Sequence, residues 1–323
     1  MSDRAPLRLP RLSCARLPLT TAIEAVNEHG ERQALAIPAE RALTVYLDKR
    51  ELVTLMTLGA RPELLVLGYL RNQRLLRSTD EVDSISVDWE VGAAAVRTRR
   101  GVADIAQRTA RRVVTTGCGQ GSLFGGLLDE VAQLSLPPAQ LQQAELYGIV
   151  EAIRLQQSVY KAAGSVHGCA LFRGDQMLMF VEDVGRHNAI DTIAGWMWLQ
   201  SEASGAGDVS EHDCSISAAP GRLQTRSQRR AQHEGGGMSG ADKVFYTTGR
   251  LTSEMVIKAA QMGVPIVVSR SGITQMGHAV AQSLGLCTIG RATHRRFLCY
   301  SAPERLLLQP ELAQLRPRVP AHA

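Results

Sequence analysis

The sequence has few aromatic residues and no long apolar run. Phenylalanine, tyrosine and tryptophan make up 4% of the 323 residues, too few for the rows of rings on which nucleic-acid bases stack. The longest apolar stretches, such as residues 64–70, fall far short of the roughly 20 residues that a membrane-spanning helix needs. The N-terminal residues carry several arginines without the uninterrupted apolar stretch of a secretory signal. We therefore expect no nucleic-acid partner and no membrane span.

Cysteine is also sparse, and the six cysteines lack the spacing of a metal site or of a disulfide framework. No CxxC pair occurs, which argues against a zinc ribbon and a dense disulfide pattern. A zinc deaminase would need an H-x-E motif together with P-C-x-x-C, and His29-Gly30-Glu31 matches only the first. The sequence predicts a reduced, cytoplasmic protein without a bound metal. The cysteines stand at positions 14, 118, 169, 214, 287 and 299.

The bulk composition is that of a folded chain with a basic balance of charge. Apolar residues make up 45% and charged residues 21% of the chain, which allows a sizeable core. The length exceeds the commonest size of a single domain, so we expect two lobes. The formal net charge of +5 favours anionic partners.

The N-terminal part is predicted to hold a disordered basic tail over residues 1–33 and an α+β lobe over residues 34–116. In that lobe, the β-rich run 43–47 precedes Asp48-Lys49, which suits a turn. A proline near the start of residues 61–70 indicates a short helix. Alternation over residues 82–91 predicts a further strand.

The C-terminal lobe, residues 117–305, is predicted to be a layered α/β structure followed by a tail over residues 306–323. Its strands and helices alternate after residue 240, which implies helices packed on a sheet. Residues 201–240 are rich in Ser, Gln, Arg and Gly and are predicted to be a disordered insertion. The predicted strands are residues 169–172, 177–181, 244–246 and 265–269, and the predicted helices are residues 139–163, 189–199, 253–262 and 274–284.

Cys118 is the first candidate for chemistry, because it stands between Gly117 and Gly119 in a glycine-rich loop. Glycine neighbours leave the sulfur unshielded and let the backbone swing it between two partners. A persulfide carrier needs such a thiolate, which attacks a sulfur donor and holds the terminal sulfur covalently. The alternative is a buried, inert cysteine, and the loop alone does not decide between the two.

A second candidate is the segment 182–188, which gathers two acids, an arginine, a histidine and an amide between a strand and a helix. Ligands bind at the strand ends of open α/β sheets. Arg186 suits bidentate binding of a phosphate, and Asn188 suits capping of the following helix. The alternative is an internal salt bridge between Asp183 and Arg186, with Asn188 as nothing more than a cap.

Three further clusters carry polar or basic side chains. Residues 247–254 and 269–274 each combine hydroxyls, a glycine and an arginine before a helix. This combination suits a phosphate cradle, but ordinary capping explains it equally well. Near the C-terminus, Arg291, His294, Arg295 and Arg296 crowd together. They suit a polyanionic ligand or, alternatively, form a solvated charged face.

Three strings of this chain resemble the FdhD family of formate dehydrogenase accessory sulfurtransferases. They are VEDVGRHNAID at residues 181–191, TGRLTSEM at residues 248–255, and SRS at residues 269–271 with Thr274 after it. The resemblance extends from residue 34 to residue 304. It implies an α/β fold, in which an α+β lobe precedes a three-layer α/β/α lobe like that of cytidine deaminases without their zinc site. It also implies a homodimer.

The resemblance further implies an activity. Members of the family take sulfur from a cysteine desulfurase as a protein persulfide and pass it to the molybdenum bis(molybdopterin guanine dinucleotide) cofactor of formate dehydrogenase. Cys118 matches the first cysteine of the family's C-G-x-C-G loop and inherits the persulfide role. Gly121 and Ser122 replace the second cysteine and the following glycine, which removes a relay between two sulfurs. A carrier with one cysteine is chemically sufficient.

By the same resemblance, the segment after Gly290 binds the cofactor. Arg291 stands where the family commonly has an aromatic residue, and its flat guanidinium can still stack on a guanine or a pterin. Arg186, Arg250 and Arg270 are expected to assist. A rival hypothesis is a non-catalytic chaperone that binds the molybdenum cofactor for a molybdoenzyme without moving sulfur. The predicted cofactor-binding residues are Arg291, Ala292, Thr293, His294, Arg295 and Arg296.

Overall fold

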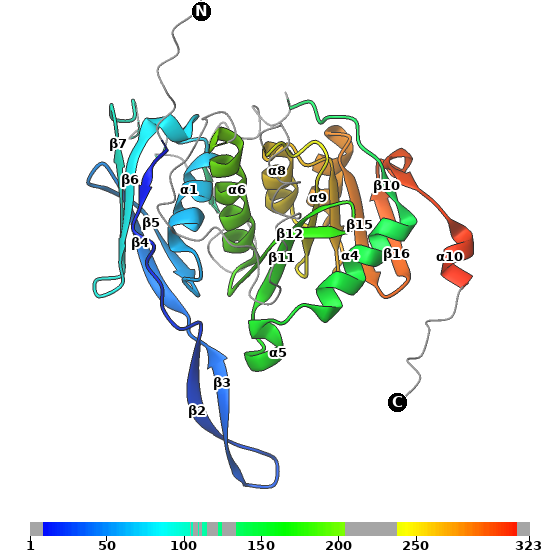
Figure 1. The fold of residues 1–323 in the computed structure, drawn as a ribbon, viewed down its shortest axis with the longest axis horizontal. Coiled ribbons are helices and arrows are strands. Elements are labelled where there is room, and N and C mark those ends of the chain that lie inside the picture. Colours follow the sequence, from blue (N-terminus) through cyan, green and yellow to red (C-terminus); the bar gives the residue numbers. More distant parts are fainter. Residues whose placement is uncertain are drawn as a thin grey trace, which may run out of the picture.

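The computed structural model describes residues 9–103, 134–203 and 238–314, together with residues 105, 109, 112–114 and 122–124. Cys118 and residues 204–237 of the predicted insertion lie outside the described residues. Two large sheets, with helices between and around them, form the body of the protein (Figure 1). No helix in the described ranges is both long and apolar enough to cross a membrane.

The N-terminal segment forms strands where a disordered tail was predicted. β2 (Thr20–Val26) and β3 (Arg32–Pro38) pair antiparallel, and this hairpin projects from the body (Figure 1). Asn27 closes the turn, because its Oδ1 accepts hydrogen bonds from the backbone nitrogens of His29 and Glu31, both at 3.0 Å. The prediction for residues 1–33 is therefore wrong over the part that the structure describes. The sequence signal for this hairpin was an asparagine turn between two runs of moderate β-propensity.

The smaller sheet has the strand order β1-β6-β7-β4-β5. Alternate residues of β4 are buried, namely Leu43, Val45 and Leu47, as expected for a strand with one face on the core. The predicted turn is confirmed, since Asp48 and Lys49 have positive φ angles of 46° and 72° that suit a two-residue hairpin. The strands are β1 (Arg11–Leu12), β4 (Arg41–Leu47), β5 (Arg50–Thr57), β6 (Val82–Asp88) and β7 (Ala93–Thr98), with α1 (Pro62–Asn72) and the 3-10 turn η1 (Thr79–Glu81) between β5 and β6.

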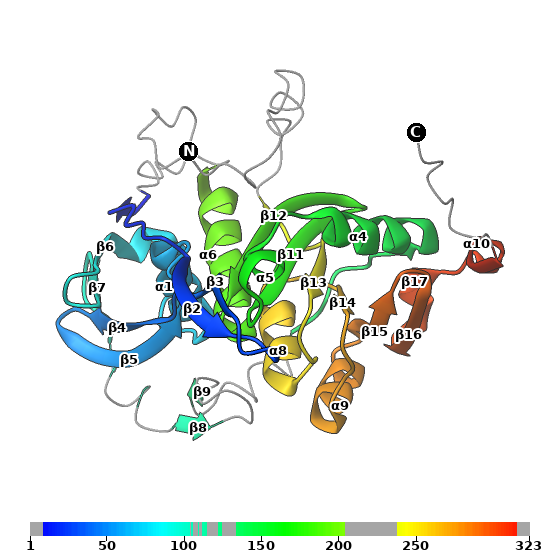
Figure 2. The same ribbon diagram turned by 90° about the horizontal axis from the view of Figure 1, so that it is seen from below.

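The larger sheet has the strand order β12-β11-β13-β14-β15-β16, and β13, β14 and β15 are parallel. Its side chains alternate between two faces. Leu171, Phe245 and Val267 join the hydrophobic cluster of α6 and α8, whereas Phe172 and Val244 join a second cluster with α4. Helices therefore cover both faces (Figures 1 and 2), which confirms the predicted α/β layering. The strands are β11 (His167–Arg173), β12 (Gln176–Asp183), β13 (Val244–Thr247), β14 (Ile266–Ser269), β15 (Cys287–Thr293) and β16 (Arg296–Ser301), and the helices are α4 (Gln143–Leu155), α6 (Arg186–Ala203), α8 (Ser253–Gln261) and α9 (Gln275–Ser283).

The helix predicted over residues 139–163 is divided into three elements. They are β10 (Leu141–Gln142), α4 and α5 (Val159–Ala163). The helix breaks after Leu155 because Ser158 caps a new one, its side chain accepting a hydrogen bond from the backbone nitrogen of Lys161 at 3.2 Å.

The predicted C-terminal tail is ordered at its start. After the 3-10 turn η2 (Pro303–Arg305), β17 (Leu306–Leu307) pairs with β10, and α10 (Pro310–Gln314) follows. Two glutamine side chains hold this segment to α4. The Oε1 of Gln143 accepts from the backbone nitrogen of Gln309 at 2.8 Å, and the Oε1 of Gln309 accepts from that of Ala144 at 3.0 Å. The tail prediction is therefore wrong for residues 306–314.

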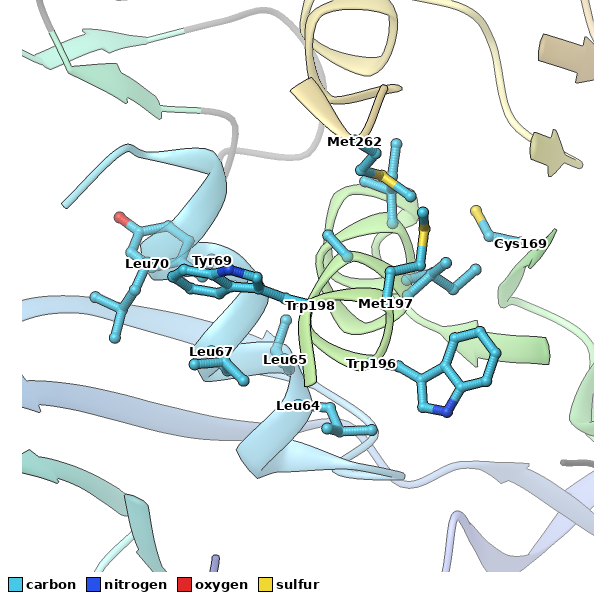
Figure 3. Close-up of a cluster of buried hydrophobic side chains, with 14 of the residues drawn as sticks. Leu64, Leu65, Leu67, Tyr69, Leu70, Cys169, Trp196, Met197, Trp198 and Met262 are labelled. Carbon is cyan, nitrogen blue, oxygen red and sulfur yellow. The ribbon is translucent and has the colours of Figure 1, made fainter. Parts of the chain in front are cut away.

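Helices α1 and α6 cross at two glycines, which let the two backbones touch. A Cβ at Gly68 would overlap the carbonyl oxygen of Asp191 and lie 2.7 Å from the backbone nitrogen of Gly195. A Cβ at Gly195 would overlap the carbonyl oxygen of Leu64. We call this contact the α1–α6 seam; it unites residues of both sheets in one hydrophobic cluster. Large side chains surround it, among them Leu65, Tyr69, Trp196, Met197 and Trp198 (Figure 3).

A chain of buried polar groups runs beside the seam and reaches α8. Asn72 Nδ2 donates to Asp191 Oδ1 at 2.7 Å, and Lys258 Nζ contacts Asp191 Oδ2 at 2.8 Å. Lys258 Nζ also lies 3.3 Å from Glu254 Oε1. The second oxygen of this carboxylate, Oε2, lies 3.3 Å from His187 Nε2. We call these five residues the buried polar chain.

The charges of the buried polar chain balance one another only in part. Burial favours the neutral amine of Lys258, but the carboxylates of Asp191 and Glu254 outweigh it and raise the pKa of Lys258. Burial lowers the pKa of His187 to about 3, despite the attraction of Glu254. His187 is therefore neutral at neutral pH, and Lys258 carries the positive charge that compensates the two carboxylates.

We predict that Gly195→Ala destabilises the protein by about 2 kcal/mol or more, because the new methyl group forces the two helix backbones apart. Alanine is the better helix former, so propensity acts in the opposite direction. Gly148→Ala in α4 is the matched control, since the three atoms nearest to its Cβ would all belong to the side chain of Asp175 on an exposed turn and none to a helix backbone. Urea unfolding of both variants measures the difference, and equal midpoints would contradict the role of the seam.

We also predict that Lys258→Met costs about 3–5 kcal/mol, because it leaves buried carboxylates without their cation. Lys243→Met is the control: Lys243 is equally buried, but its partner Asp242 is half exposed to solvent, where an ion pair contributes about 1 kcal/mol or less. Adding Asp191→Asn to Lys258→Met should recover part of the loss. Thermal unfolding of the three variants tests this, and similar losses for both lysines would overturn it.

Candidate functional site

The polar motifs of the larger sheet meet at one edge. β13, β14 and β15 are parallel, so their carboxyl ends lie side by side. β11 is antiparallel to β12 and β13, which places His167, at its start, opposite Asp183 at the end of β12. Backbone hydrogen bonds join the loop after β14 to the neighbouring strands: Arg270 N to Thr247 O of β13 at 3.0 Å, and Arg291 N of β15 to Ser271 O at 2.7 Å. We call this the polar edge, and ligands of open α/β sheets bind at such edges.

Several hydroxyls of the polar edge are committed to its turns. Thr247 Oγ1 accepts from the backbone nitrogen of Gly249 at 3.1 Å. Ser269 Oγ donates to the Gly249 carbonyl at 2.7 Å and accepts from the Ser271 nitrogen at 2.9 Å. Thr274 caps α9 through the Gly277 nitrogen at 3.1 Å. For these hydroxyls the capping and turn alternative is confirmed, and they are not free to hold a phosphate.

Arg186 differs from these groups, because two nitrogens of its guanidinium are buried without a hydrogen-bond partner among the described residues. It is the first residue of α6 and is 2% exposed. Within the described part of the chain, its Nε and Nη2 have no hydrogen-bond partner. Its stem lies on Gly249, where a Cβ would come within 2.6 Å of Arg186 Cδ. A buried, unsatisfied guanidinium is suited to an anionic ligand.

The predicted alternative, a salt bridge between Asp183 and Arg186, does not occur among the described residues. Asp183 instead accepts hydrogen bonds from Thr57 Oγ1 at 2.5 Å and from Asn188 Nδ2 at 3.1 Å. Burial raises the pKa of Asp183 to about 6, although these bonds favour its ionised form. Asp183 thus ties the larger sheet to β5.

Asn188 was expected to cap the helix, and this is wrong. α6 begins at Arg186, so Asn188 lies inside its first turn. Its Nδ2 donates to the Met56 carbonyl at 2.6 Å as well as to Asp183. The side chain connects α6 to β5, a contact across 132 positions of the chain that no local pattern could reveal.

Two other side chains of the polar edge are neutral. His167 is half-buried, and burial, followed by the charges of Arg186 and Arg250, lowers its pKa. Cys169 is buried beside Thr247, and burial raises the pKa of its thiol to about 12. Cys169 therefore stays protonated at neutral pH, whereas His167 can offer a ring nitrogen to a ligand that reaches Arg186.

A basic groove lies next to the polar edge, around the hairpin of β15 and β16. Its cavity has a volume of about 650 Å³. Arg295 is held over the ring of Tyr147 at 5.8 Å and donates to the Leu312 carbonyl at 2.7 Å. Tyr147 meets Phe297 edge to face, with ring centroids 6.3 Å apart. The groove is lined by Gln143, Tyr147, Arg291, Thr293, Arg295, Arg296, Phe297, Leu298, Leu308, Pro310 and Ala313.

The groove unites four of the six predicted cofactor-binding residues. Arg291, Thr293, Arg295 and Arg296 line it. Ala292 is 2% exposed and belongs to the core cluster, and His294 occupies the hairpin turn with φ 52° without lining the cavity.

The sequence prediction missed the other wall of the groove, which α4 and α10 supply. Tyr147 lies about 150 positions before the predicted segment, and Pro310 lies shortly after it. The available signal was Pro310-Glu311, which is typical of a helix start, in a stretch predicted to be a tail.

Guanidinium groups beside aromatic rings can bind a ligand that is both anionic and planar. Arginine forks match phosphate oxygens, and the rings offer stacking surfaces to a heterocycle. Arg291 belongs to both places, because its backbone joins the polar edge and its side chain lines the groove.

The loop of Cys118 starts and ends in two short paired strands. β8 (Arg112–Val114) and β9 (Ser122–Phe124) are antiparallel, with Val114 opposite Ser122. Cys118 itself lies outside the described residues, so its role stays a prediction.

Known proteins are similar to this one over most of its chain. Residues 38–210 and 233–307 match the model of the FdhD/NarQ family. The sulfur carrier protein FdhD of Halalkalibacterium halodurans is 28% identical over 274 residues, which cover 84% of this chain and 88% of that protein. The protein of the same name from Staphylococcus aureus strain MRSA252 is 25% identical over 269 residues, 83% of this chain and 88% of its own.

A solved structure has the same fold. It is a formate dehydrogenase accessory protein from Desulfotalea psychrophila, with a TM-score of 0.64 and 22% identity, and the match covers 90% of this chain and all of that one. The family match spans well over half of the sequence. This protein therefore belongs to the FdhD/NarQ family.

Proposed function

We propose that this protein is a sulfur carrier that accepts sulfur from a cysteine desulfurase and transfers it to the molybdenum bis(molybdopterin guanine dinucleotide) cofactor of formate dehydrogenase. The observation that carries this proposal is the similarity, over 84% of the chain, to a protein named as a sulfur carrier. The name of the solved structure, a formate dehydrogenase accessory protein, supports the choice of recipient.

Cys118 carries the sulfur in this proposal. Its thiolate attacks the terminal sulfur of a persulfide on the desulfurase, the S–S bond of the donor breaks, and the donor thiolate leaves. The sulfur then rests on Cys118 as a persulfide until the cofactor accepts it. Because Gly121 replaces the second cysteine of the family loop, no neighbouring loop thiol competes for it.

The basic groove holds the cofactor as the second substrate. Arg291 and Arg296 bind phosphate oxygens, and Tyr147 and Phe297 offer faces and edges to a planar ring. Arg186, Arg250 and Arg270 extend the positive charge along the polar edge, with Arg186 as the buried member. We expect the protein to work as a homodimer in the cytoplasm.

We predict that Cys118→Ser abolishes persulfide formation and maturation of formate dehydrogenase while nucleotide binding stays intact. Intact-protein mass spectrometry after incubation with a cysteine desulfurase and cysteine should find the gain of one sulfur on the wild type. Reductant and the serine variant should each remove that gain. A wild type that gains no sulfur from an active desulfurase, yet binds nucleotide, would favour the non-catalytic chaperone.

We predict that Arg291→Ala and Arg296→Ala each weaken binding of guanosine diphosphate, the nucleotide half of the proposed ligand, by about 10-fold or more. This is the size of effect expected when a hydrogen bond to a charged group is lost. Arg50→Ala is the control, because Arg50 is an exposed arginine at the start of β5, in the other sheet. Isothermal titration calorimetry measures all three, and unchanged affinity in the groove variants would place the nucleotide elsewhere.

A further inference from the structure

Two cysteines that play no part in the proposed transfer are in contact on adjacent strands of the larger sheet. Cys287 begins β15 and Cys299 lies on the neighbouring strand β16. Their Sγ atoms are 3.9 Å apart, and both thiols are free. An isolated cysteine in a core needs no function, but two thiols in contact can react with each other.

The geometry brings the two thiols into contact from adjacent strands. The strands are antiparallel neighbours, and Cys299 pairs with Ile289, two residues after Cys287, next to a register irregularity between Thr288 and Ile289. A disulfide is about 2.05 Å long and spans neighbouring backbones. The two sulfurs therefore have to approach each other from 3.9 Å to form the bond.

The two thiols are not equivalent. Cys287 is fully buried, whereas Cys299 is partly exposed. The hydrogen bond between them lowers the pKa of Cys299 and, together with burial, raises that of Cys287. Cys299 is thus the thiol that ionises and meets a reagent, and Cys287 is the thiol that can attack only its neighbour.

The pair also lies close to the basic groove. Cys299 and Phe297 share one face of β16, two residues apart, which is about 7 Å along a strand. Phe297 lines the groove, and both side chains pack on the cluster that α4 covers. Cys299 is therefore two residues along the strand from a side chain that lines the groove.

We propose that Cys287 and Cys299 form a second sulfur-handling site, which takes sulfane sulfur from a persulfide and releases it as hydrogen sulfide. This activity is separate from the proposed transfer through Cys118 and does not require it.

The reaction has two steps. The Cys299 thiolate attacks the outer sulfur of a persulfide R–S–SH, the S–S bond of the donor breaks, and R–S⁻ leaves and takes a proton. Cys287 then attacks Sγ of Cys299, and the terminal sulfur departs with the electron pair of the broken bond and the proton of Cys287. One persulfide and two thiols thus yield R–SH, hydrogen sulfide and a disulfide. The sulfane sulfur is reduced and the two cysteines are oxidised, and a dithiol reductant restores the pair.

The test uses the full-length Cys118→Ser variant, so that the proposed transfer cannot contribute. It is incubated without oxygen with glutathione persulfide, alkylated, and mapped by peptide mass spectrometry, and sulfide is measured against a protein-free blank. We expect a disulfide between the peptides of Cys287 and Cys299 and about one equivalent of sulfide above the blank.

Two further variants separate the steps. Adding Cys287→Ser should leave one extra sulfur on Cys299, with no disulfide and no sulfide above the blank. Adding Cys299→Ser should leave Cys287 unmodified, since it is buried. Cys169 is an internal control in every sample, because it is equally buried, has no thiol neighbour among the described residues, and should stay a free thiol.

The Cys118→Ser sample alone decides the matter, even if a variant of the buried Cys287 fails to fold. Recovery of Cys287 and Cys299 as alkylated free thiols, with no sulfide above the blank, would overturn the proposal. So would one extra sulfur on Cys299 that persists beside an unreacted Cys287. Neither outcome is evidence for or against the proposed role of Cys118, which the desulfurase experiment tests separately.

Discussion

The close approach of α1 and α6 is the constraint on which the rest of the structure depends. Gly68 and Gly195 let the helix backbones touch, and the buried polar chain fastens both helices to α8. α1 packs on the smaller sheet and α6 packs on the larger sheet. Their contact therefore joins two layered units in one core. A glycine crossing of this kind leaves no room for a larger side chain without separating the helices.

The same constraint positions the polar edge. Asp183 and Asn188 stand around the start of α6, and both hold β5 through hydrogen bonds to Thr57 and Met56. Arg186 lies between them in the chain and is buried, and its Nε and Nη2 have no hydrogen-bond partner in the described structure. Asp183 and Asn188 thus have structural hydrogen bonds, whereas two nitrogens of Arg186 have none in the described structure.

Positive charge continues from this edge into the basic groove. Arg291 links the two places through its backbone, and Arg295 is fixed by Tyr147 and Leu312. A fixed guanidinium beside aromatic rings loses little entropy when it binds a flat anion. The cysteines to which we assign sulfur chemistry as a proposal lie apart in the sequence. Cys118 comes far before the groove, and Cys287 and Cys299 lie on the two strands of its hairpin.

The sequence by itself determined the α/β class, most strands and helices of the larger sheet, and the basic segment after Gly290, because period-2 and period-3.6 patterns and local charge are properties of neighbouring residues. The sequence did not predict contacts between residues that are far apart in the chain. The wall of the groove from Tyr147 and α10, the bond of Asn188 to β5 and the glycine seam all join positions far apart in the chain. Only the tertiary structure decided these, since burial and pairing depend on which elements meet and not on the residues beside them.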